Sequence, residues 1–249
     1  MSTSTLTKIN TLTFDVFGTI LDLSSGIVPT VENFLENRQA KISGAQFWQL
    51  WRSRQRIEQY QDTIVMLGHS GYLEVARRAL LYTLRQQQLT VEPEETLKLM
   101  RTFEQLKPFD DAVLGLNRLA KRFQLVALSN GNASLVKHLV SNNIPVHFDA
   151  ALSADAVGRF KPHPSVYRYA AKTLNREPDQ IMMVASHAFD VTDPEPLPRD
   201  HPILQLDNLT IVPHLGSATV ETRQKMSEIS VANLKAGMRG EPLLYEVKP

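Results

Sequence analysis

Polar side chains follow three apolar segments of this sequence, each at the point where the segment ends. In a parallel α/β sheet, ligands bind at the carboxyl ends of the strands. A carboxylate there can attack an electrophilic carbon or phosphorus and form a covalent ester or acyl phosphate. A hydroxyl and an amide at the next strand end can hold an anionic group. The residues in these places are Asp15, then Ser129 and Asn130, then His187 and Asp190.

The chain has no cysteine among its 249 residues. This excludes a disulfide scaffold, a thiolate nucleophile and every cysteine-based zinc or iron–sulfur site. Any nucleophile must therefore be an oxygen or a nitrogen. With 27 Lys and Arg against 26 Asp and Glu, the formal charge is +1. This charge gives no electrostatic case for binding nucleic acid or an anionic membrane surface.

The N-terminal segment carries one lysine, Lys8, and no apolar run behind it. We therefore expect neither a signal peptide nor an anchor there. No stretch approaches the roughly 20 apolar residues that a membrane span needs. The sequence favours a soluble, cytoplasmic protein.

Strand and helix patterns alternate in two parts of the chain. Short apolar runs begin at Leu12 and cover 123–128, 148–152 and 181–184, and helical patterns cover 133–140 and 165–174. Strands that alternate with helices predict an α/β fold with a doubly wound parallel sheet covered on both faces. Between them, about 27–109 has helical spacing, as in Phe47, Leu50 and Trp51, and no good strand. It predicts an inserted helical subdomain.

Four motifs in the right order resemble those of the haloacid dehalogenase (HAD) superfamily over about residues 11–190. The resemblance implies a HAD-like core formed by 1–24 and 110–190, and a helical cap formed by 25–109. Any one motif alone is weak, because an aspartate after a strand is more often a turn or a helix cap. The motifs are Asp15-Val16-Phe17-Gly18-Thr19, Ser129-Asn130-Gly131, Lys161-Pro162 and Asp190.

Phe17 distinguishes between branches of this superfamily. Phosphatases of the superfamily carry a second aspartate two residues after the nucleophile, where it serves the leaving alcohol as acid and base. Phe17 has no proton to give. The segment resembles the L-2-haloacid dehalogenase branch instead, in which halide leaves as an anion. We keep a phosphatase as the alternative.

The resemblance implies four catalytic residues, Asp15, Lys161, Asp190 and Thr19, and puts Tyr167 with the binding residues. Asp15 would displace halide from C2 of an L-2-haloacid and form an ester. Lys161 would keep that carboxylate ionised and stabilise charge. Asp190 would activate the water that releases the D-2-hydroxy acid. Thr19 and Tyr167 would orient the acidic network.

The resemblance also implies a binding set. Ser129 would hold the substrate carboxylate, and Arg52, Asn130 and Phe189 would surround the halide. Arg52 is the best match to the arginine that the family carries in its cap, although Arg54 stays open. A solvated helix face is the competing interpretation of these arginines.

The segment before Asp190 departs from the best-known family pattern. Many members have Ser-Ser-Asn where this chain has Ala185-Ser186-His187. His187 would then replace an asparagine that helps to position water. As a single residue, it is more often a structural histidine than a metal ligand.

The same resemblance implies no metal and no cofactor. A haloacid carries one negative charge, which Lys161 and Arg52 can neutralise. Magnesium would be needed only if the phosphatase alternative holds. The expected partner is a small 2-haloacid or a similar small anion, and a homodimer stays open.

Residues 191–249 resemble a different family, the D-isomer-specific 2-hydroxyacid dehydrogenases, most closely their glyoxylate/hydroxypyruvate reductases. The residue at His214 is the acid–base partner of hydride transfer in that family. Yet no Gly-x-Gly-x-x-Gly occurs in this chain, so an NAD(P)-dependent reductase is the least favoured alternative. The matching segments are 190–198, 209–219 and 236–242.

The chain therefore resembles a hybrid that joins at Asp190-Val191. We expect the tail to complete the core sheet with a strand at 209–212 and a helix at 220–238. A catalytically impaired hybrid is the remaining alternative, because the foreign segment directly follows Asp190.

Overall fold

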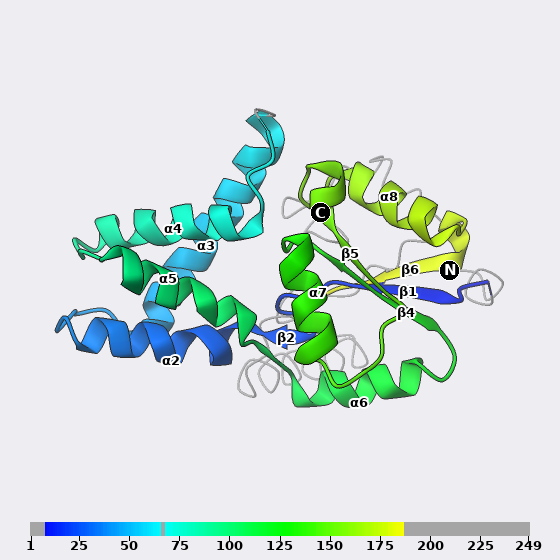
Figure 1. The fold of residues 1–249 in the computed structure, drawn as a ribbon, viewed down its shortest axis with the longest axis horizontal. Coiled ribbons are helices and arrows are strands. Elements are labelled where there is room, and N and C mark those ends of the chain that lie inside the picture. Colours follow the sequence, from blue (N-terminus) through cyan, green and yellow to red (C-terminus); the bar gives the residue numbers. More distant parts are fainter. Residues whose placement is uncertain (1–7, 66–67, 187–249) are drawn as a thin grey trace, which may run out of the picture. The chain divides into compact units, whose positions relative to one another are not determined.

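The computed structural model describes residues 8–65 and 68–186. Within these ranges, four parallel strands form one sheet in the order β5-β4-β1-β6 (Figure 1). β1 lies in the middle, paired with β4 on one side and β6 on the other. The four predicted strand regions are thereby confirmed. The strands are β1 (Thr11–Phe14), β4 (Gln124–Ser129), β5 (Ala150–Ser153) and β6 (Ile181–Val184).

The central strand β4 is buried on both faces, and its side chains alternate between two hydrophobic clusters. Leu125 and Ala127 face the cluster that includes α6 and α7, whereas Val126 and Leu128 face the one that includes α8. This alternation follows from the two-residue period of a strand. The doubly wound α/β prediction is confirmed. The helices are α6 (Asp110–Leu119), α7 (Ala133–Asn142) and α8 (Pro164–Leu174), and the short 3-10 turns are η2 (Ala154–Val157) and η3 (Pro178–Gln180).

Helix α8 begins and ends on residues that suit those positions. Pro164 occupies its first turn, where a missing N–H costs nothing, and the His163 ring accepts a hydrogen bond from the Ser165 N–H. The helix ends at Asn175, whose φ of 50° is left-handed. Such a residue is a common helix terminator.

An antiparallel pair of two-residue strands, β2 (Leu21–Asp22) and β3 (Lys107–Pro108), brackets the helical insertion. The prediction that 27–109 holds no strand is wrong for Lys107–Pro108, because two residues are too few to show a period. Asp22 also caps the first helix by accepting hydrogen bonds from the Ser24 and Ser25 N–H groups. The inserted elements are α2 (Leu23–Glu36), α3 (Gly44–Val65), α4 (Tyr72–Gln86), α5 (Pro93–Arg101) and η1 (Thr102–Glu104).

Aromatic rings form the centre of the helical insertion. Trp51 meets Trp48 and Phe103 edge to face, and its indole N–H donates to the Ala76 carbonyl at 2.8 Å. Phe47 is buried beside them. Leu50, which recurs at the same helical spacing, is 45% exposed. Gln55 and Gln59 continue the buried face instead.

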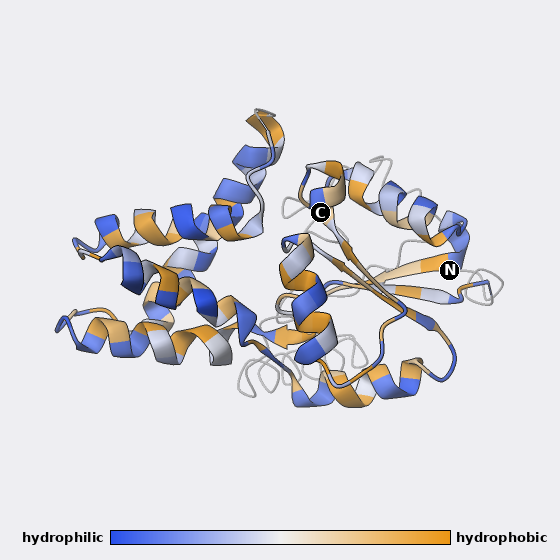
Figure 2. Cartoon of the chain, viewed as in Figure 1, coloured by the Kyte–Doolittle hydropathy of each residue, from blue (hydrophilic) through white to orange (hydrophobic). Residues whose placement is uncertain are grey.

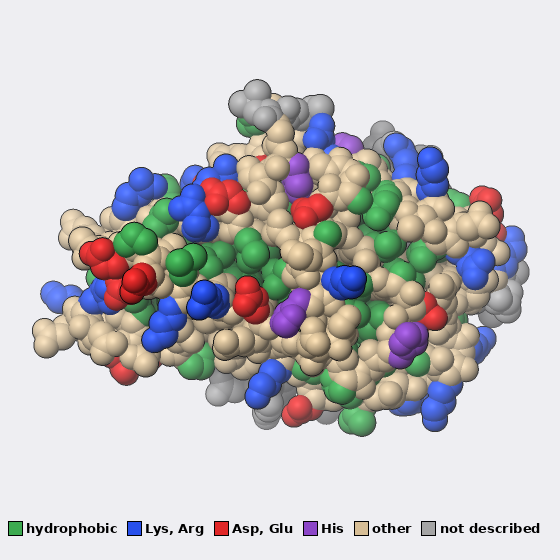
Figure 3. Space-filling view, viewed as in Figure 1, with side chains coloured by type: hydrophobic (Ala, Val, Ile, Leu, Met, Phe, Trp, Pro, Cys, Tyr) green, Lys and Arg blue, Asp and Glu red, His purple; other side chains and the backbone are tan. Residues whose placement is uncertain are grey.

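The surface agrees with the balanced composition. Figure 2 shows both hydrophilic and hydrophobic residues along α4, α5, α6 and α7, as expected of amphipathic helices. Figure 3 shows basic and acidic side chains interspersed over one face. Within the described ranges, no helix is long and apolar enough to cross a membrane.

Several predictions fall on residues that the structure does not describe. They concern His187, Phe189, Asp190, the strand at 209–212, the helix at 220–238 and His214.

Candidate active site

Asp15 lies at the carboxyl end of β1 and is nearly buried, with 5% of its surface exposed. Its backbone N–H donates to the Val184 carbonyl at 3.0 Å, which ties it to β6. Lys161 Nζ donates to Asp15 Oδ1 at 2.9 Å, and Thr19 Oγ1 donates to Oδ2 at 2.8 Å. The structure thus brings together three of the predicted catalytic residues.

Asn130 fixes the backbone of Lys161. Its Oδ1 accepts a hydrogen bond from the Lys161 N–H at 2.7 Å, and its Nδ2 donates to the Lys161 carbonyl at 3.4 Å. The Lys161 side chain is fully buried. A buried cation at this distance favours the ionised form of the Asp15 carboxyl group. The predicted contact of Asn130 with halide stays a prediction.

The turn after Asp15 places Thr19 against the carboxylate. Gly18 has a φ of 84°, which favours glycine, and its N–H donates to the Leu21 carbonyl at 2.9 Å. The Thr19 hydroxyl accepts from the Ser186 N–H at 3.0 Å while it donates to Asp15. The Ser186 hydroxyl donates in turn to the Gly18 carbonyl at 2.7 Å. β6 therefore supports both Asp15 and Thr19.

Ser129, at the end of β4, is fully buried. Its hydroxyl oxygen accepts a hydrogen bond from the Gly131 N–H at 3.1 Å. A Cβ on Gly131 would lie 2.7 Å from Phe17 and 2.8 Å from Val136, so a larger residue does not fit. The loop that carries Ser129 is consequently packed against the residue two positions after Asp15.

Tyr72, the first residue of α4, brings the insertion against this loop. Its ring stacks on Phe17 with centroids 4.6 Å apart and planes 4° apart. Its hydroxyl accepts a hydrogen bond from Arg52 Nη1 at 3.3 Å, and Gln55 Oε1 accepts from the same nitrogen at 3.1 Å. Burial raises the pKa of Tyr72; Arg52 lowers it in part, and the Asp15 carboxylate adds to the rise. The phenol is therefore protonated.

Arg52 and Arg54 make different contacts, and the choice of Arg52 as the cap arginine stays a prediction. Arg54 donates to Glu58 Oε1 at 3.0 Å and lies over the Tyr82 ring at 4.0 Å. Arg52 instead contacts Tyr72, which stacks on the loop after Asp15. The sequence alone left these two arginines open.

Tyr167 lies on α8, where it packs against the buried cluster that contains Leu128 and Leu152. Its role in the acidic network stays a prediction. The same holds for His187, Phe189 and Asp190, which lie outside the described residues.

Two residues near Arg52 were not predicted from the sequence. Gln55 is fully buried and lies three positions after Arg52, so helical spacing could have placed both on one face. Among the described residues, its Nε2 has no hydrogen-bond partner. Tyr72 gave no signal, because an aromatic residue at a helix start is usually core. Both belong to the surroundings of Arg52.

Metal ligands do not gather in the described part of the chain, where no group of three His, Asp or Glu side chains could hold an ion. Asp190, the second carboxyl group expected in the site, lies outside that part of the chain.

Comparison with known proteins places most of the chain in one family. The family of haloacid dehalogenase-like hydrolases matches residues 9–192. An (S)-2-haloacid dehalogenase of Xanthobacter autotrophicus is 32% identical over 187 residues, which cover 74% of this chain and 70% of that protein. The solved L-2-haloacid dehalogenase from the same organism is 30% identical, covers 74% of this chain and 72% of its own, and superposes with a TM-score of 0.65. Another structure of that enzyme, with chloropropionic acid covalently bound, has a TM-score of 0.64 at 29% identity, over 74% of this chain and 72% of its own.

A second likeness covers the C-terminal part. Human glyoxylate reductase/hydroxypyruvate reductase is 54% identical over 65 residues, which are 26% of this chain and only 20% of that enzyme. The predicted resemblance to two families is thereby confirmed. Because the shared segment is only a short part of the reductase, this likeness is no evidence that the chain has reductase activity. The first and larger part decides the family: the chain belongs to the haloacid dehalogenase-like hydrolases.

Proposed function

We propose that this chain hydrolyses L-2-haloacids to D-2-hydroxy acids through an ester on Asp15. The observation that carries the proposal is the buried Asp15 carboxylate, held by Lys161 Nζ at 2.9 Å and Thr19 Oγ1 at 2.8 Å. Both partners donate, so they favour an ionised and fixed nucleophile. The names of the relatives support the substrate class.

In the first step, an Asp15 oxygen attacks C2 of the haloacid. The new carbon–oxygen bond forms as the carbon–halogen bond breaks, the configuration at C2 inverts, and halide leaves with the bonding electrons. Since halide needs no proton, Phe17 can stand where a phosphatase needs an acid. Arg52, beside Tyr72, would stabilise the departing anion, and Ser129 would hold the carboxylate. The covalent chloropropionic acid in the Xanthobacter enzyme supports such an ester.

In the second step, water adds to the ester carbonyl carbon. The carbonyl oxygen gains negative charge, and the donor that holds this oxygen, Lys161 if it is Oδ1 or Thr19 if it is Oδ2, stabilises that charge by a hydrogen bond. The acyl carbon–oxygen bond then breaks, which releases the D-2-hydroxy acid and restores the Asp15 carboxylate. Asp190 is the proposed base for this water.

The direct test is halide release from L-2-chloropropionate in metal-free buffer. We expect turnover by the wild type and none by Asp15→Asn. Asp179→Asn is the matched control, because Asp179 forms an exposed ion pair with Lys8 and lies in η3, before the start of β6, whereas Asp15 follows the end of β1, which pairs in parallel with β6. Halide release by the Asp15→Asn variant would show that Asp15 is not the nucleophile.

Two further results would point elsewhere. Magnesium-dependent turnover of p-nitrophenyl phosphate would favour the phosphatase alternative. A folded protein with no turnover on either substrate would favour the catalytically impaired hybrid. The reason to consider that alternative is the C-terminal part, which resembles a reductase.

A further inference from the structure

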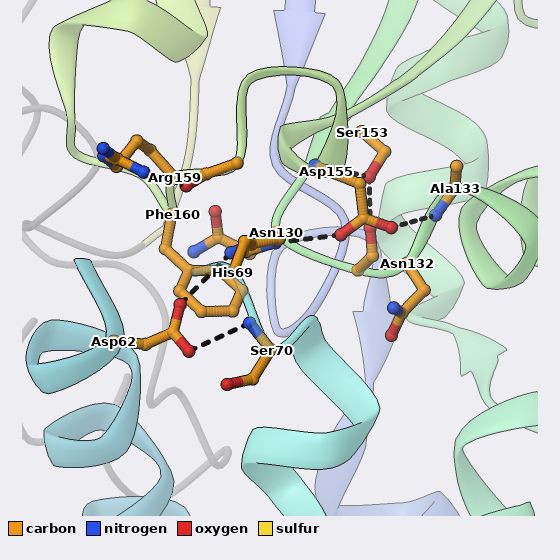
Figure 4. A network of polar contacts seen from close by, with 12 residues as sticks. Asp62, His69, Ser70, Asn130, Asn132, Ala133, Ser153, Asp155, Arg159 and Phe160 are labelled. Atoms are coloured by element: carbon orange, nitrogen blue, oxygen red, sulfur yellow. Dashed lines mark hydrogen bonds and ion pairs between the residues drawn. The ribbon is translucent and has the colours of Figure 1, made fainter. Parts of the chain in front are cut away.

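One imidazole links the helical insertion to the core at a place outside the site described above. His69 lies between α3 and α4, and both of its ring nitrogens face carboxylates (Figure 4). Nδ1 is 3.2 Å from Asp62 Oδ1, on α3, and Nε2 is 3.0 Å from Asp155 Oδ1, in η2. The side chains of Asp62 and His69 are only 3% and 12% exposed.

The imidazole lies between two carboxylates, which accept hydrogen bonds when they are ionised, and either ring nitrogen can carry the N–H that donates. Burial alone would raise the pKa of Asp62, but hydrogen bonds from Ser70 and His69 outweigh it and lower that pKa. Asp62 is therefore ionised, and Arg78 Nη2 lies 3.6 Å from its other oxygen.

On the core side, Asp155 is also hydrogen-bonded to the end of the loop that carries Ser129 and Asn130. Its second oxygen accepts a hydrogen bond from the Ala133 N–H at 2.9 Å, at the start of α7. The Ser153 hydroxyl accepts from the Asp155 N–H and donates to the Gly131 carbonyl at 2.6 Å. Asp155 thus holds the 129–133 loop at its far end.

The helical insertion also forms a direct hydrogen bond with this loop. The Leu73 N–H, at the start of α4, donates to Asn132 Oδ1 at 2.9 Å. Leu73 lies a few residues after His69, so the same turn of the insertion makes both contacts. Loss of one contact is expected to loosen the other.

His69 also contacts the segment that carries Lys161. Its ring lies against Phe160, with centroids 4.5 Å apart. The Phe160 N–H donates to Thr63 Oγ1 on α3 at 3.3 Å. Phe160 directly precedes Lys161, whose ammonium group pairs with Asp15.

We propose that His69 is a positioning residue, a clamp between Asp62 and Asp155 that keeps the insertion against the 129–133 loop and Phe160. Substrate then meets a loop and a lysine that are already in place. When the clamp is lost, only a fraction of molecules is competent to bind, and the apparent affinity falls by that fraction. The inference rests on the proposed function for its kinetic readout, but not for its second readout.

The variants separate hydrogen bonding from packing. His69→Phe keeps a ring against Phe160 and removes both donors. His69→Gln keeps one donor group. His147→Gln is the matched control, because His147 is an exposed histidine between α7 and β5. Since His69→Phe removes the imidazole between the Asp62 and Asp155 carboxylates, Asp62→Asn/His69→Phe is made beside it to remove one of these charges and restore stability.

The kinetic readout is halide release from L-2-chloropropionate. A charged hydrogen bond contributes enough for KM to rise about tenfold or more in His69→Phe, while kcat stays within about threefold. The double variant should keep the raised KM although it is more stable. A KM equal to that of the wild type, or a fall in kcat alone, would overturn the clamp.

The second readout is amide hydrogen exchange of the substrate-free protein. We expect faster exchange, by about tenfold, in peptides that contain Leu73 and Ala133, with no change in His147→Gln. Faster exchange in the His69 variants supports the clamp even if the wild type releases no halide, in which case the proposed function alone has failed. Exchange equal to that of the wild type overturns the clamp whatever the activity.

Discussion

Lys161 Nζ lies 2.9 Å from Asp15 Oδ1, although 146 positions separate the two residues in the chain. Both side chains are almost fully buried. A buried pair of this kind is not a large source of stability by itself, but removing one partner leaves a buried charge without compensation. The pair therefore couples stability to the chemistry of the site.

Replacing Lys161 by methionine should impair both properties. We expect the free energy of unfolding to fall by about 3–5 kcal/mol, because the Asp15 carboxylate loses its cation. Halide release should fall about a hundredfold or more, because charge on the ester carbonyl loses a donor. Urea unfolding and initial rates measure the two effects.

The double variant Asp15→Asn/Lys161→Met separates them. It removes both charges, so most of the lost stability should return while activity stays absent. If the double variant is as unstable as Lys161→Met, packing and not the uncompensated charge explains the loss.

Tyr72→Phe should weaken substrate binding while leaving the fold intact. The phenylalanine ring can still stack on Phe17, but Arg52 loses the oxygen that accepts its hydrogen bond. A hydrogen bond to a charged group is worth about tenfold or more in affinity, so we expect KM to rise by that factor. Tyr82→Phe is the control, since its ring stays beneath Arg54. Equal KM values for both variants would contradict the role of Tyr72.

Arg52→Ala and Arg54→Ala should differ in their effect on catalysis. Arg52 adjoins Tyr72 and Gln55, whereas Arg54 is held by Glu58 on the same helix. We expect kcat/KM to fall about a hundredfold for Arg52→Ala, as for loss of a donor to developing charge. Arg54→Ala should cost at most about 1 kcal/mol of stability, as partly exposed pairs do. The reverse order of activities would exchange the two assignments.

Acid should weaken the protein in part through Asp62. Its pKa is lowered in the folded state, chiefly by Ser70 and His69 acting against burial. A carboxyl group with a lowered folded pKa contributes stability above its unfolded pKa and loses it as pH falls through the folded value. The free energy of unfolding of the wild type should therefore decline below about pH 4 more steeply than that of Asp62→Asn. Parallel curves for the two proteins would contradict this.

The sequence determined the sheet and the order of the site residues. Apolar runs with strand composition predicted β1, β4, β5 and β6, because a doubly covered sheet demands continuous burial. The ends of these strands carry Asp15 and Ser129, so their convergence followed from the topology of a parallel sheet. Local pattern suffices for such features, because each depends on neighbours within a few residues.

Only the tertiary structure decided which side chains meet across the insertion. Leu50 recurs at helical spacing with Phe47 and Trp51, but the packing of α3 against its neighbours leaves Leu50 exposed and buries Gln55 instead. The stacking of Tyr72 on Phe17 and the bridging of Asp62 and Asp155 by His69 join segments that are far apart in the chain. Such contacts depend on how two packed units are oriented, which no local period records.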